Sequence, residues 1–179
     1  FAYGGIGINS AGRVIEVVTK KTFDSVIPEK LFRPMGMRTA TFYNENGNAP
    51  NPSGGAVCSA FDYLNFMQML LNKGTFNNKR ILSEKAVQEM LTIQFPALRV
   101  RYTPELAKDF KYALGSWVQE RDEAEKGFVF SCPGLLGTWP WIDTKRNYVG
   151  IVFSKELITG QKKELSIQIK EAADAALEQ

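Results

Sequence analysis

The sequence contains no histidine, and this absence restricts its chemistry more than any other feature of the composition. Without an imidazole, the chain cannot build a Ser-His-Asp or Cys-His nucleophile pair, or a His-based metal site, from its own residues. Acid–base chemistry within these 179 residues must therefore use tyrosine, lysine, aspartate or glutamate. We expect neither a metal nor a cofactor.

Cysteine is also scarce, because Cys58 and Cys132 are the only two and lie far apart in the sequence. They imply neither a disulfide framework nor a zinc site. No apolar run approaches the roughly 20 residues that a membrane-spanning helix needs, and no basic and then apolar leader opens the chain. The first residue is Phe1 rather than methionine, so we expect a processed or truncated product.

Charge of one sign is not concentrated in any segment. The chain has 22 lysine and arginine residues and 19 aspartate and glutamate residues, which gives a net charge of +3, and the basic residues are scattered. A nucleic-acid partner would require a basic stripe with interleaved aromatic residues. We therefore expect no nucleic-acid partner and no membrane span.

The residues that are present make an ordinary globular composition, with 44% hydrophobic and 23% charged residues. A chain of this length can bury roughly 70% of the surface that it exposes when unfolded. Helical periodicity precedes a run of short β-prone segments, which predicts an α+β fold with an antiparallel sheet flanked by helices. We expect residues 1–110 to be mainly helix and loop, and 111–179 to form antiparallel strands and a C-terminal helix.

Apolar spacing, caps and turn residues predict the individual elements. We expect helices over 7–21, 22–32 with an interruption at Pro28, 59–74 and 83–91, and strands over 112–118, 128–131, 138–142 and 148–154. A closing helix after Gly160 should turn one face toward the sheet, formed by Leu165, Ile169, Ala172, Ala173 and Ala176. Residues 39–57 and 93–110 should be irregular. One flank of this sheet stays incompletely covered, which predicts a missing partner segment or another copy of the chain.

The stretch from Phe128 to Asp143 is typical of a strand, a tight turn and a second strand. Pro133 has no N–H to donate to a neighbouring strand, so it belongs at a sheet edge or a bulge. A strand that ends in glycine, as at Gly134, lets another group approach the backbone. We expect one wall of a site here, although an ordinary hairpin would use the same residues.

Several segments match one known family in the expected order. They are 1–16, which carries Phe-Ala-Tyr-Gly-Gly, 31–42 with Pro-Met-Gly-Met, 53–62 with Gly-Gly before a helix, 80–83 and 112–117. Together they resemble the serine β-lactamase and penicillin-binding-protein superfamily, in particular its class C-like esterase and peptidase branch. The resemblance covers nearly the whole chain but only the C-terminal part of the family, and it implies that family's β-lactamase/transpeptidase-like fold.

The nucleophile of this family lies upstream, in a Ser-x-x-Lys motif at the start of a buried helix. No serine in this sequence, from Ser10 to Ser166, has a lysine three residues later. The resemblance therefore implies the C-terminal portion of a β-lactamase-like domain, without its Ser-x-x-Lys helix.

The resemblance also assigns roles to residues near the N-terminus. Tyr3 matches the family tyrosine that shuttles a proton between the serine and the leaving group, although a packed aromatic residue would look the same. A phenol with an ordinary pKa near 10 needs a nearby cation for this task at neutral pH. Gly5 stands where the family often has a substrate-orienting asparagine. Gly54 and Gly55 should border the cleft.

Cys132, Pro133 and Gly134 fall where the family carries Lys-Thr-Gly or His-x-Gly. Gly134 fits a role in letting the substrate lie along the strand, and the backbone N–H of Leu135 is the candidate oxyanion donor. Cys132 and Pro133 remove the charge and hydroxyl that help to hold a substrate carboxylate. Cys132 is either a nucleophile or a cysteine that only packs. Trp139 and Trp141 are candidates for an apolar wall, or are core residues.

We expect the full protein to be a serine hydrolase, β-lactamase-like or esterase-like, that acts on small-molecule esters or amides without a carboxylate through an acyl-serine. Two other functions stay open: a catalytically inactive binding or structural module of the same fold, and an assembly module that buries its uncovered flank. Family members are often exported, so the resemblance favours an exported or periplasmic location, while the residues themselves leave the compartment open.

Overall fold

A computed structural model describes residues 1–43, 49–94 and 100–178. Its helical elements are α1 (Gly5–Thr19), α2 (Phe23–Ile27), the π-helical turn η1 (Pro28–Phe32), α3 (Ala60–Leu71), α4 (Glu84–Met90), the 3-10 turn η2 (Glu105–Ala107) and α5 (Gly160–Leu177). Its strands are β1 (Thr75–Phe76), β2 (Lys79–Arg80), β3 (Lys111–Tyr112), β4 (Trp117–Arg121), β5 (Gly127–Ser131), β6 (Trp139–Asp143) and β7 (Tyr148–Val152). The predicted α+β class with an antiparallel sheet is confirmed.

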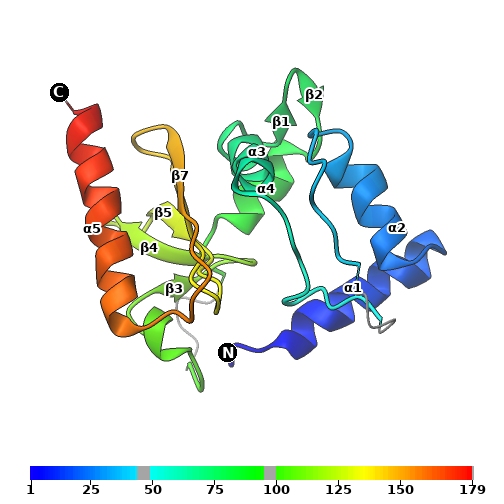
Figure 1. The fold of residues 1–179 in the computed structure, drawn as a ribbon, viewed down its shortest axis with the longest axis horizontal. Coiled ribbons are helices and arrows are strands. Elements are labelled where there is room, and N and C mark those ends of the chain that lie inside the picture. The colour runs from blue at the N-terminus through cyan, green and yellow to red at the C-terminus, as the bar shows by residue number, and fades with distance from the viewer. Residues whose placement is uncertain (44–48, 95–99, 179) are drawn as a thin grey trace.

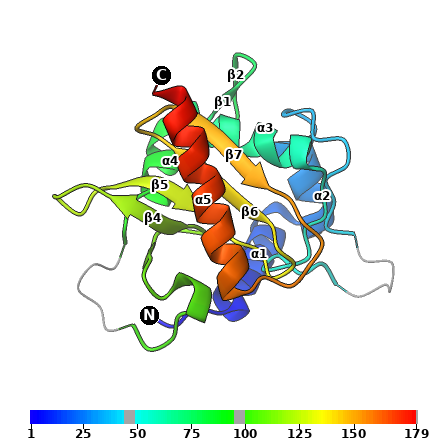
Figure 2. The same ribbon diagram turned by 60° about the vertical axis from the view of Figure 1, so that its left-hand side comes forward.

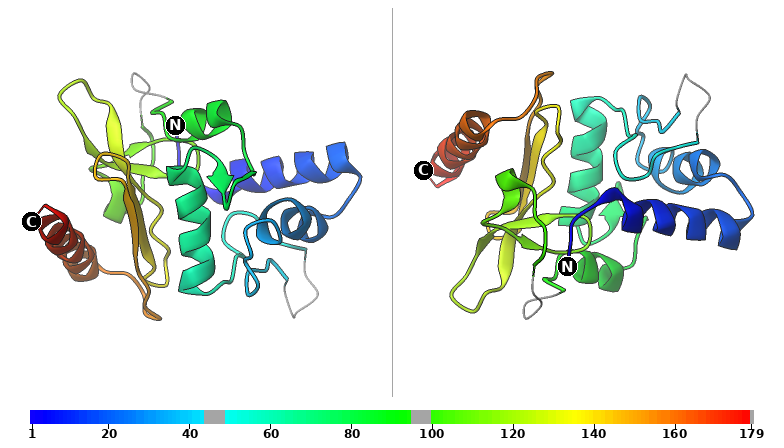
Figure 3. Two further views of the ribbon diagram at one scale, coloured as in Figure 1. Left: turned by 90° about the horizontal axis from the view of Figure 1, so that it is seen from above. Right: turned by 90° about the horizontal axis from the view of Figure 1, so that it is seen from below.

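The elements are arranged in layers around one sheet. α5 covers one face of the sheet, α3 and α4 lie on the other side, and α1 and α2 lie beyond them (Figures 1 and 2). Viewed along a perpendicular direction, α5, the sheet, α3 and the N-terminal helices follow one another in the same order (Figure 3). No helix among the described residues is long and apolar enough to cross a membrane.

The main sheet has the strand order β3-β4-β5-β6-β7, and every neighbouring pair is antiparallel. The hairpin predicted over 128–143 is confirmed, because β5 pairs with β6 from Val129 opposite Asp143 to Ser131 opposite Trp141. β5 ends at Ser131, so Pro133 lies in the connection after the strand. Its missing N–H therefore interrupts no strand pairing, although β5 is central in the sheet.

Two strand predictions need correction. The single strand expected over 112–118 is a tight hairpin, in which β3 pairs with β4 and Gly115 adopts a φ of 87° between them. This turn breaks the strand because a positive φ is costly for residues other than glycine. The short hairpin of β1 and β2 was not predicted, although its turn was, and Asn77 and Asn78 both have positive φ there.

The N-terminal helices contact each other and the loop before α3. α1 ends at Thr19 because Lys20 adopts a left-handed φ of 55°, and Gly12 is buried where a Cβ atom would lie 2.5 Å from Pro52. The predicted interruption at Pro28 coincides with the end of α2 at Ile27 and the start of η1, in which Arg33 N–H donates to the Pro28 carbonyl at 3.0 Å. The outer face of α1 is apolar and exposed, and consists of Ile6, Val14, Val17 and Val18.

α3 and α4 begin at the serine caps that the sequence predicts. The Ser59 hydroxyl accepts from Asp62 N–H at 3.2 Å, and the Ser83 hydroxyl accepts from Ala86 N–H at 3.1 Å. The Asp62 carboxylate turns back to accept from the N–H and hydroxyl of Thr39, at 2.7 and 2.6 Å. These bonds fix the irregular segment before α3 on the start of the helix. α3 then packs its apolar side chains against β6 and β7, in a core that includes Met35, Met67, Met69, Leu70 and Ile142.

The orientation of α5 contradicts the prediction. Leu165 and Ile169 are 55% and 40% exposed, and Ala172 and Ala176 are also exposed, while Ser166, Lys170 and Asp174 are buried against the sheet. Of the predicted inner face, only Ala173 is partly buried. The helix was predicted correctly, but the wrong face was expected to pack.

A buried ionic network explains this orientation. The Lys170 ammonium lies 2.7 Å from Asp174, 2.8 Å from Glu120 and 3.3 Å from Asp143. The Tyr148 hydroxyl donates to Asp174 at 2.5 Å. Because the sheet supplies partners for the lysine and for Asp174, the polar stripe of α5 can be buried without leaving a charge unpaired.

Candidate active site

Backbone hydrogen bonds join the first residues of the chain to the segment at residues 101–102. Arg101 N–H donates to the Phe1 carbonyl at 2.7 Å, and Tyr3 N–H donates to the Tyr102 carbonyl at 3.0 Å. The Tyr3 ring then packs on two aromatic rings of the β3–β4 hairpin, with centroid distances of 5.2 Å to Trp117 and 5.8 Å to Tyr112. These contacts hold the predicted proton shuttle beside the main sheet.

The connection between β5 and β6 is a compact turn. Gly134 N–H donates to the Thr138 carbonyl at 2.8 Å, and Gly137 N–H donates to the Gly134 carbonyl at 3.0 Å. Gly137 has a φ of 90°, and a Cβ atom there would lie 2.2 Å from the Ser154 hydroxyl oxygen, so only glycine fits. The turn presents Leu135 and Leu136 as exposed apolar side chains.

Within the described part of the chain, one of the two backbone hydrogen-bonding groups of Leu135 has a partner. Its carbonyl accepts from Ile158 N–H at 3.0 Å. Its own N–H has no hydrogen-bond acceptor within the described part of the chain, so it is free to donate to a group outside these residues. A free backbone donor beside an exposed turn has the chemistry required of an oxyanion donor.

Cys132 connects the turn to three tyrosines. Its side chain is exposed, yet desolvation by the surrounding protein raises the pKa of the thiol. Burial is the main cause of a raised pKa for Tyr3, and the neighbouring Cys132 adds to it. Burial likewise raises the pKa of Tyr63 and of Tyr112, and Cys132 contributes to both. The rings of Tyr3 and Tyr112 contact each other, and Cys132 lies close enough to both, and to Tyr63, to affect their pKa values.

The direction of these shifts limits what the described residues can do. All three phenols and the thiol keep their protons at neutral pH, because their pKa values are raised above ordinary values of 8.5 or higher. The cluster can therefore donate hydrogen bonds and protons. A general base at Tyr3 would need a cation supplied from outside the described residues.

The glycines expected along the cleft lie at and beside the start of α1. A Cβ atom on Gly5 would lie 2.8 Å from the Ser53 hydroxyl oxygen, which places the start of α1 against the 51–55 turn. Ser53 N–H donates to the Asn9 side-chain oxygen at 3.0 Å, and Gly55 N–H donates to the Asn51 carbonyl at 2.7 Å. Gly54 is exposed on the same turn, so the turn flanks the segment that carries Tyr3.

Trp139 does not line an open surface. It is fully buried with Val129 and Trp141 in the core that faces α5, and the side chain of Phe110 packs against it at a ring distance of 6.4 Å. The expected apolar wall is therefore wrong for Trp139, and of the two alternatives the core is the correct one for both tryptophans. The exposed apolar residues beside Cys132 are Leu135 and Leu136 instead.

Tyr63 and Tyr112 were not predicted as site residues. Tyr112 begins one of the segments that resemble the family, but no role was predicted for its phenol. Tyr63 belongs to an amphipathic helix, where an aromatic residue is expected in the core. Only the packing of α3 against the sheet brings it toward Cys132. No cluster of three or more metal-ligating side chains occurs among the residues that the structure describes.

Comparisons with known proteins agree with this geometry. A β-lactamase family model matches residues 1–174. Curated protein sequences give no match. A structure from Bacteroides dorei, provisionally named a β-lactamase, is 30% identical with a TM-score of 0.76, and the alignment covers 89% of this chain and 50% of that one.

Two more distant structures share the fold. A β-lactamase from Mycobacterium bovis is 20% identical with a TM-score of 0.79, covering 98% of this chain and 64% of that one. A mutant of simvastatin synthase from Aspergillus terreus is 17% identical with a TM-score of 0.77, covering 98% of this chain and 55% of that one. This chain thus spans only 50% to 64% of the length of these structures. Since the family model matches nearly all of its residues, the chain belongs to the β-lactamase family.

Proposed function

We propose that this chain is the C-terminal part of a serine hydrolase that cleaves esters or amides, and that the serine nucleophile comes from a segment outside these 179 residues. The proposal is supported by the proximity of the Tyr3 phenol to Cys132, and by the free N–H of Leu135 three residues further along the turn that follows Cys132. These groups supply a proton carrier and an oxyanion donor, but no activated nucleophile. The sequence contains no Ser-x-x-Lys motif to provide one.

The proposed reaction uses each group once. The incoming serine oxygen attacks the substrate carbonyl carbon while Tyr3 accepts the serine proton. The carbonyl oxygen becomes an oxyanion that accepts a hydrogen bond from Leu135 N–H. Tyr3 then gives its proton to the leaving alcohol or amine, and water later releases the acid from the acyl-serine. The lysine of the incoming segment is the cation that lowers the raised pKa of Tyr3 enough for the first step.

The substrate in this proposal carries no carboxylate near the scissile bond. Cys132 is uncharged at neutral pH and Pro133 has no hydroxyl, so neither binds an anion as a lysine or threonine would. The exposed side chains beside them, Leu135 and Leu136, are apolar. This surface favours an apolar acyl or alkyl group over a charged one.

The partner in this proposal is the remaining part of a longer polypeptide. The similar structures contain chain beyond the part that this sequence matches. The exposed apolar face of α1, with Ile6, Val14, Val17 and Val18, is the surface that such a segment would cover near Tyr3. A second copy of this chain is the alternative partner, and the measured mass of the 179-residue chain in solution would distinguish them.

The main experiment compares two polypeptides. The 179-residue chain and a longer polypeptide that supplies a Ser-x-x-Lys segment are each incubated with a chromogenic ester and a chromogenic β-lactam. We expect no turnover by the chain alone, and ester turnover well above β-lactam turnover by the longer polypeptide. Turnover by the chain alone would contradict the catalytic assignment. A natural parent sequence without Ser-x-x-Lys would favour the inactive module instead.

Tyr3→Phe tests the proton carrier in the longer polypeptide. The ring and its contacts with Trp117 and Tyr112 are retained, so only the hydroxyl is lost. We expect kcat to fall by about 10²- to 10⁴-fold, because general acid–base catalysis contributes this much. Tyr102→Phe is the matched control, since Tyr102 is exposed and adjacent in the same backbone bridge. An equal loss in both variants would indicate a structural effect.

Cys132→Ala tests the remaining nucleophile candidate. A thiol whose pKa is raised has little thiolate at neutral pH, so we expect ester turnover to be retained. Complete loss in this variant, together with labelling of Cys132 by a reactive ester, would replace the serine mechanism with a thiol mechanism. Mass spectrometry of the acyl-enzyme identifies which residue carries the acyl group.

A further inference from the structure

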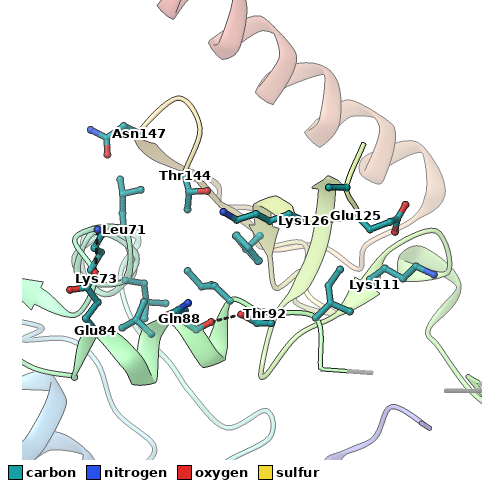
Figure 4. Close-up of a pocket in the computed structure, with 17 residues that line it drawn as sticks. Leu71, Lys73, Glu84, Gln88, Thr92, Lys111, Glu125, Lys126, Thr144 and Asn147 are labelled. Carbon is teal, nitrogen blue, oxygen red and sulfur yellow. Dashed lines mark hydrogen bonds and ion pairs between the residues drawn. The ribbon is translucent and has the colours of Figure 1, made fainter. Parts of the chain in front are cut away.

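A pocket of about 930 Å³ lies at the opposite end of β5 from Cys132. The ends of α3 and α4 form one side, and the β4–β5 hairpin and the turn after β6 form the other (Figure 4). Gly127 at the start of β5 lines the pocket, while Ser131 ends the strand beside the candidate active site. At about 3.3 Å per residue, these ends are about 13 Å apart. The lining includes none of Tyr3, Cys132 and Leu135, although Phe130 extends it to within two residues of Cys132.

The floor of the pocket is apolar. Val87 and Phe130, each 3% exposed, line it. Leu71, Leu91 and Ile93 extend this surface. The floor thus offers an aliphatic or aromatic ligand a continuous surface, and the volume lies within the usual range for small-molecule sites.

The rim carries more available positive than negative charge. Its lining includes Lys73, Lys111 and Lys126 against Glu84 and Glu125. Glu84 already pairs with Lys73 at 3.2 Å, and Glu125 pairs with Arg121 at 3.3 Å. Lys111 and Lys126 have no ion-pair partner within the described ranges of the chain. In Figure 4 the Lys126 side chain extends across the opening toward Thr144.

We propose that this pocket binds an amphipathic carboxylate, such as a medium-chain fatty acid, with its alkyl chain on the Val87 and Phe130 floor and its carboxylate on Lys126. A free ammonium above an apolar surface matches both halves of such a ligand. Lys111 adds positive potential at the rim. The rim carboxylates do not oppose it, because both are neutralised by their own partners. Binding at this site requires neither Tyr3 nor an external nucleophile. The binding proposal can therefore be tested independently of the proposed function.

The test uses the 179-residue chain and decanoate as the probe, below its micelle concentration. Methyl-detected NMR should show saturable shifts at Leu71, Val87 and Leu91, and no comparable shifts at Val14 and Val17 on the exposed face of α1. Calorimetry should give one site per chain. Decanol, which has the same alkyl chain without the charge, should bind about tenfold more weakly.

Two pairs of variants locate the carboxylate and the alkyl chain. Lys126→Glu should weaken decanoate binding at least tenfold, while Lys79→Glu makes the same charge change on an exposed residue outside the pocket and should not. Gln88→Trp places a large side chain over the opening and should abolish binding, while Lys85→Trp on the same helix should not. All four positions are exposed, so thermal unfolding should confirm that the variants fold.

Several results would overturn the proposal. Equal binding of decanol and decanoate would show that the rim charge plays no part. Equal weakening by the Lys126 and Lys79 variants would show a general charge effect. Shifts that spread over α1, or binding that survives Gln88→Trp, would show that decanoate only coats exposed apolar surfaces. Absence of saturable binding would leave the pocket to a polypeptide segment and would reject a carboxylate ligand.

Discussion

The two faces of the main sheet are held by different chemistry. On the face toward α3, methionine and aliphatic side chains pack against β6 and β7, with Met69, Leu70 and Ile142 buried among them. On the face toward α5, an apolar cluster around Trp139 is continued by the buried network of Lys170 and its carboxylates. One sheet thus supports a core that is almost wholly apolar and a core that is partly ionic.

This difference determines what each face tolerates. Apolar packing is not directional, so another side chain of similar volume can take the place of the original. The ionic network depends on a single ammonium that is 1% exposed and contacts Glu120, Asp143 and Asp174. Removing the lysine leaves Asp143 and Asp174 charged and buried, with side chains 0% and 12% exposed, which costs more than the pairs contributed. The α5 face should therefore be the less tolerant of the two.

Among these variants, Lys170→Ala should cause the largest loss of stability. It leaves three carboxylates without their lysine, and Arg146 is the cation that still pairs with two of them, so we expect the free energy of unfolding to fall by about 3–5 kcal/mol. Lys162→Ala removes a lysine from the same helix whose partner, Glu156, is exposed, and should cost under about 1 kcal/mol. Urea unfolding of both variants measures the difference. Equal costs would mean that the buried network contributes no more than a surface pair.

Met69→Ala gives the corresponding cost on the apolar face. Met69 is fully buried, so we expect a loss of about 3 kcal/mol from the missing contacts and the cavity. Met69→Leu conserves most of the volume and should cost less than about 1.5 kcal/mol. If the leucine variant were as unstable as the alanine variant, the packing on this face would require the shape of methionine and not only its volume.

The faces also differ in how well the sequence predicts them. The apolar periodicity of 59–74 predicts α3 as a helix, and the residues that pack against it in the core are apolar as well. In α5, two stripes have helical spacing: Leu165 with Ile169, and Ser166 with Lys170 and Asp174. The apolar stripe was expected inside. The polar stripe is inside because Asp143 and Glu120, remote in the sequence, supply partners that no local pattern reveals.

The residues of the candidate site also differ in how well the sequence predicts them. The resemblance to a family named Tyr3, Leu135 and the turn at Cys132, and Tyr3 lies close enough to Cys132 for that thiol to affect its pKa. Tyr63 was missed because its helix looks like an ordinary core helix, and the role of a phenol depends on what lies opposite. Trp139 and Trp141 were offered either as an apolar wall or as core residues, because the sequence does not show which face of the strand meets α5; both belong to the core.

The ionic face should also respond more strongly to acid. Contacts with Lys170 and Tyr148 outweigh the opposing effect of burial and lower the pKa of Asp174. Its contribution to stability is therefore present above the unfolded-state pKa near 3.9 and is lost as the pH falls through the lower folded-state value. Asp174→Asn should be less stable than the wild type at pH 6, and the difference should shrink toward pH 2. Urea unfolding measures the stability of both proteins. If their free energies of unfolding differ by the same amount from pH 6 to pH 2, the ionised Asp174 carboxylate contributes nothing to stability.

The smallest expected effect concerns the outer face of α5, where the orientation of the helix can be tested directly. Ile169 is 40% exposed, so Ile169→Gln should change the free energy of unfolding by less than about 0.5 kcal/mol. Ile167 is two positions earlier and packs against the cluster of Val129, Trp139 and Trp141, so Ile167→Gln should cost about 1–3 kcal/mol. The hydrophobic pattern alone predicts the opposite order, because it places Ile169 inside. A larger cost at Ile169 would mean that α5 packs on the face that the sequence first indicated, with the lysine network open to solvent.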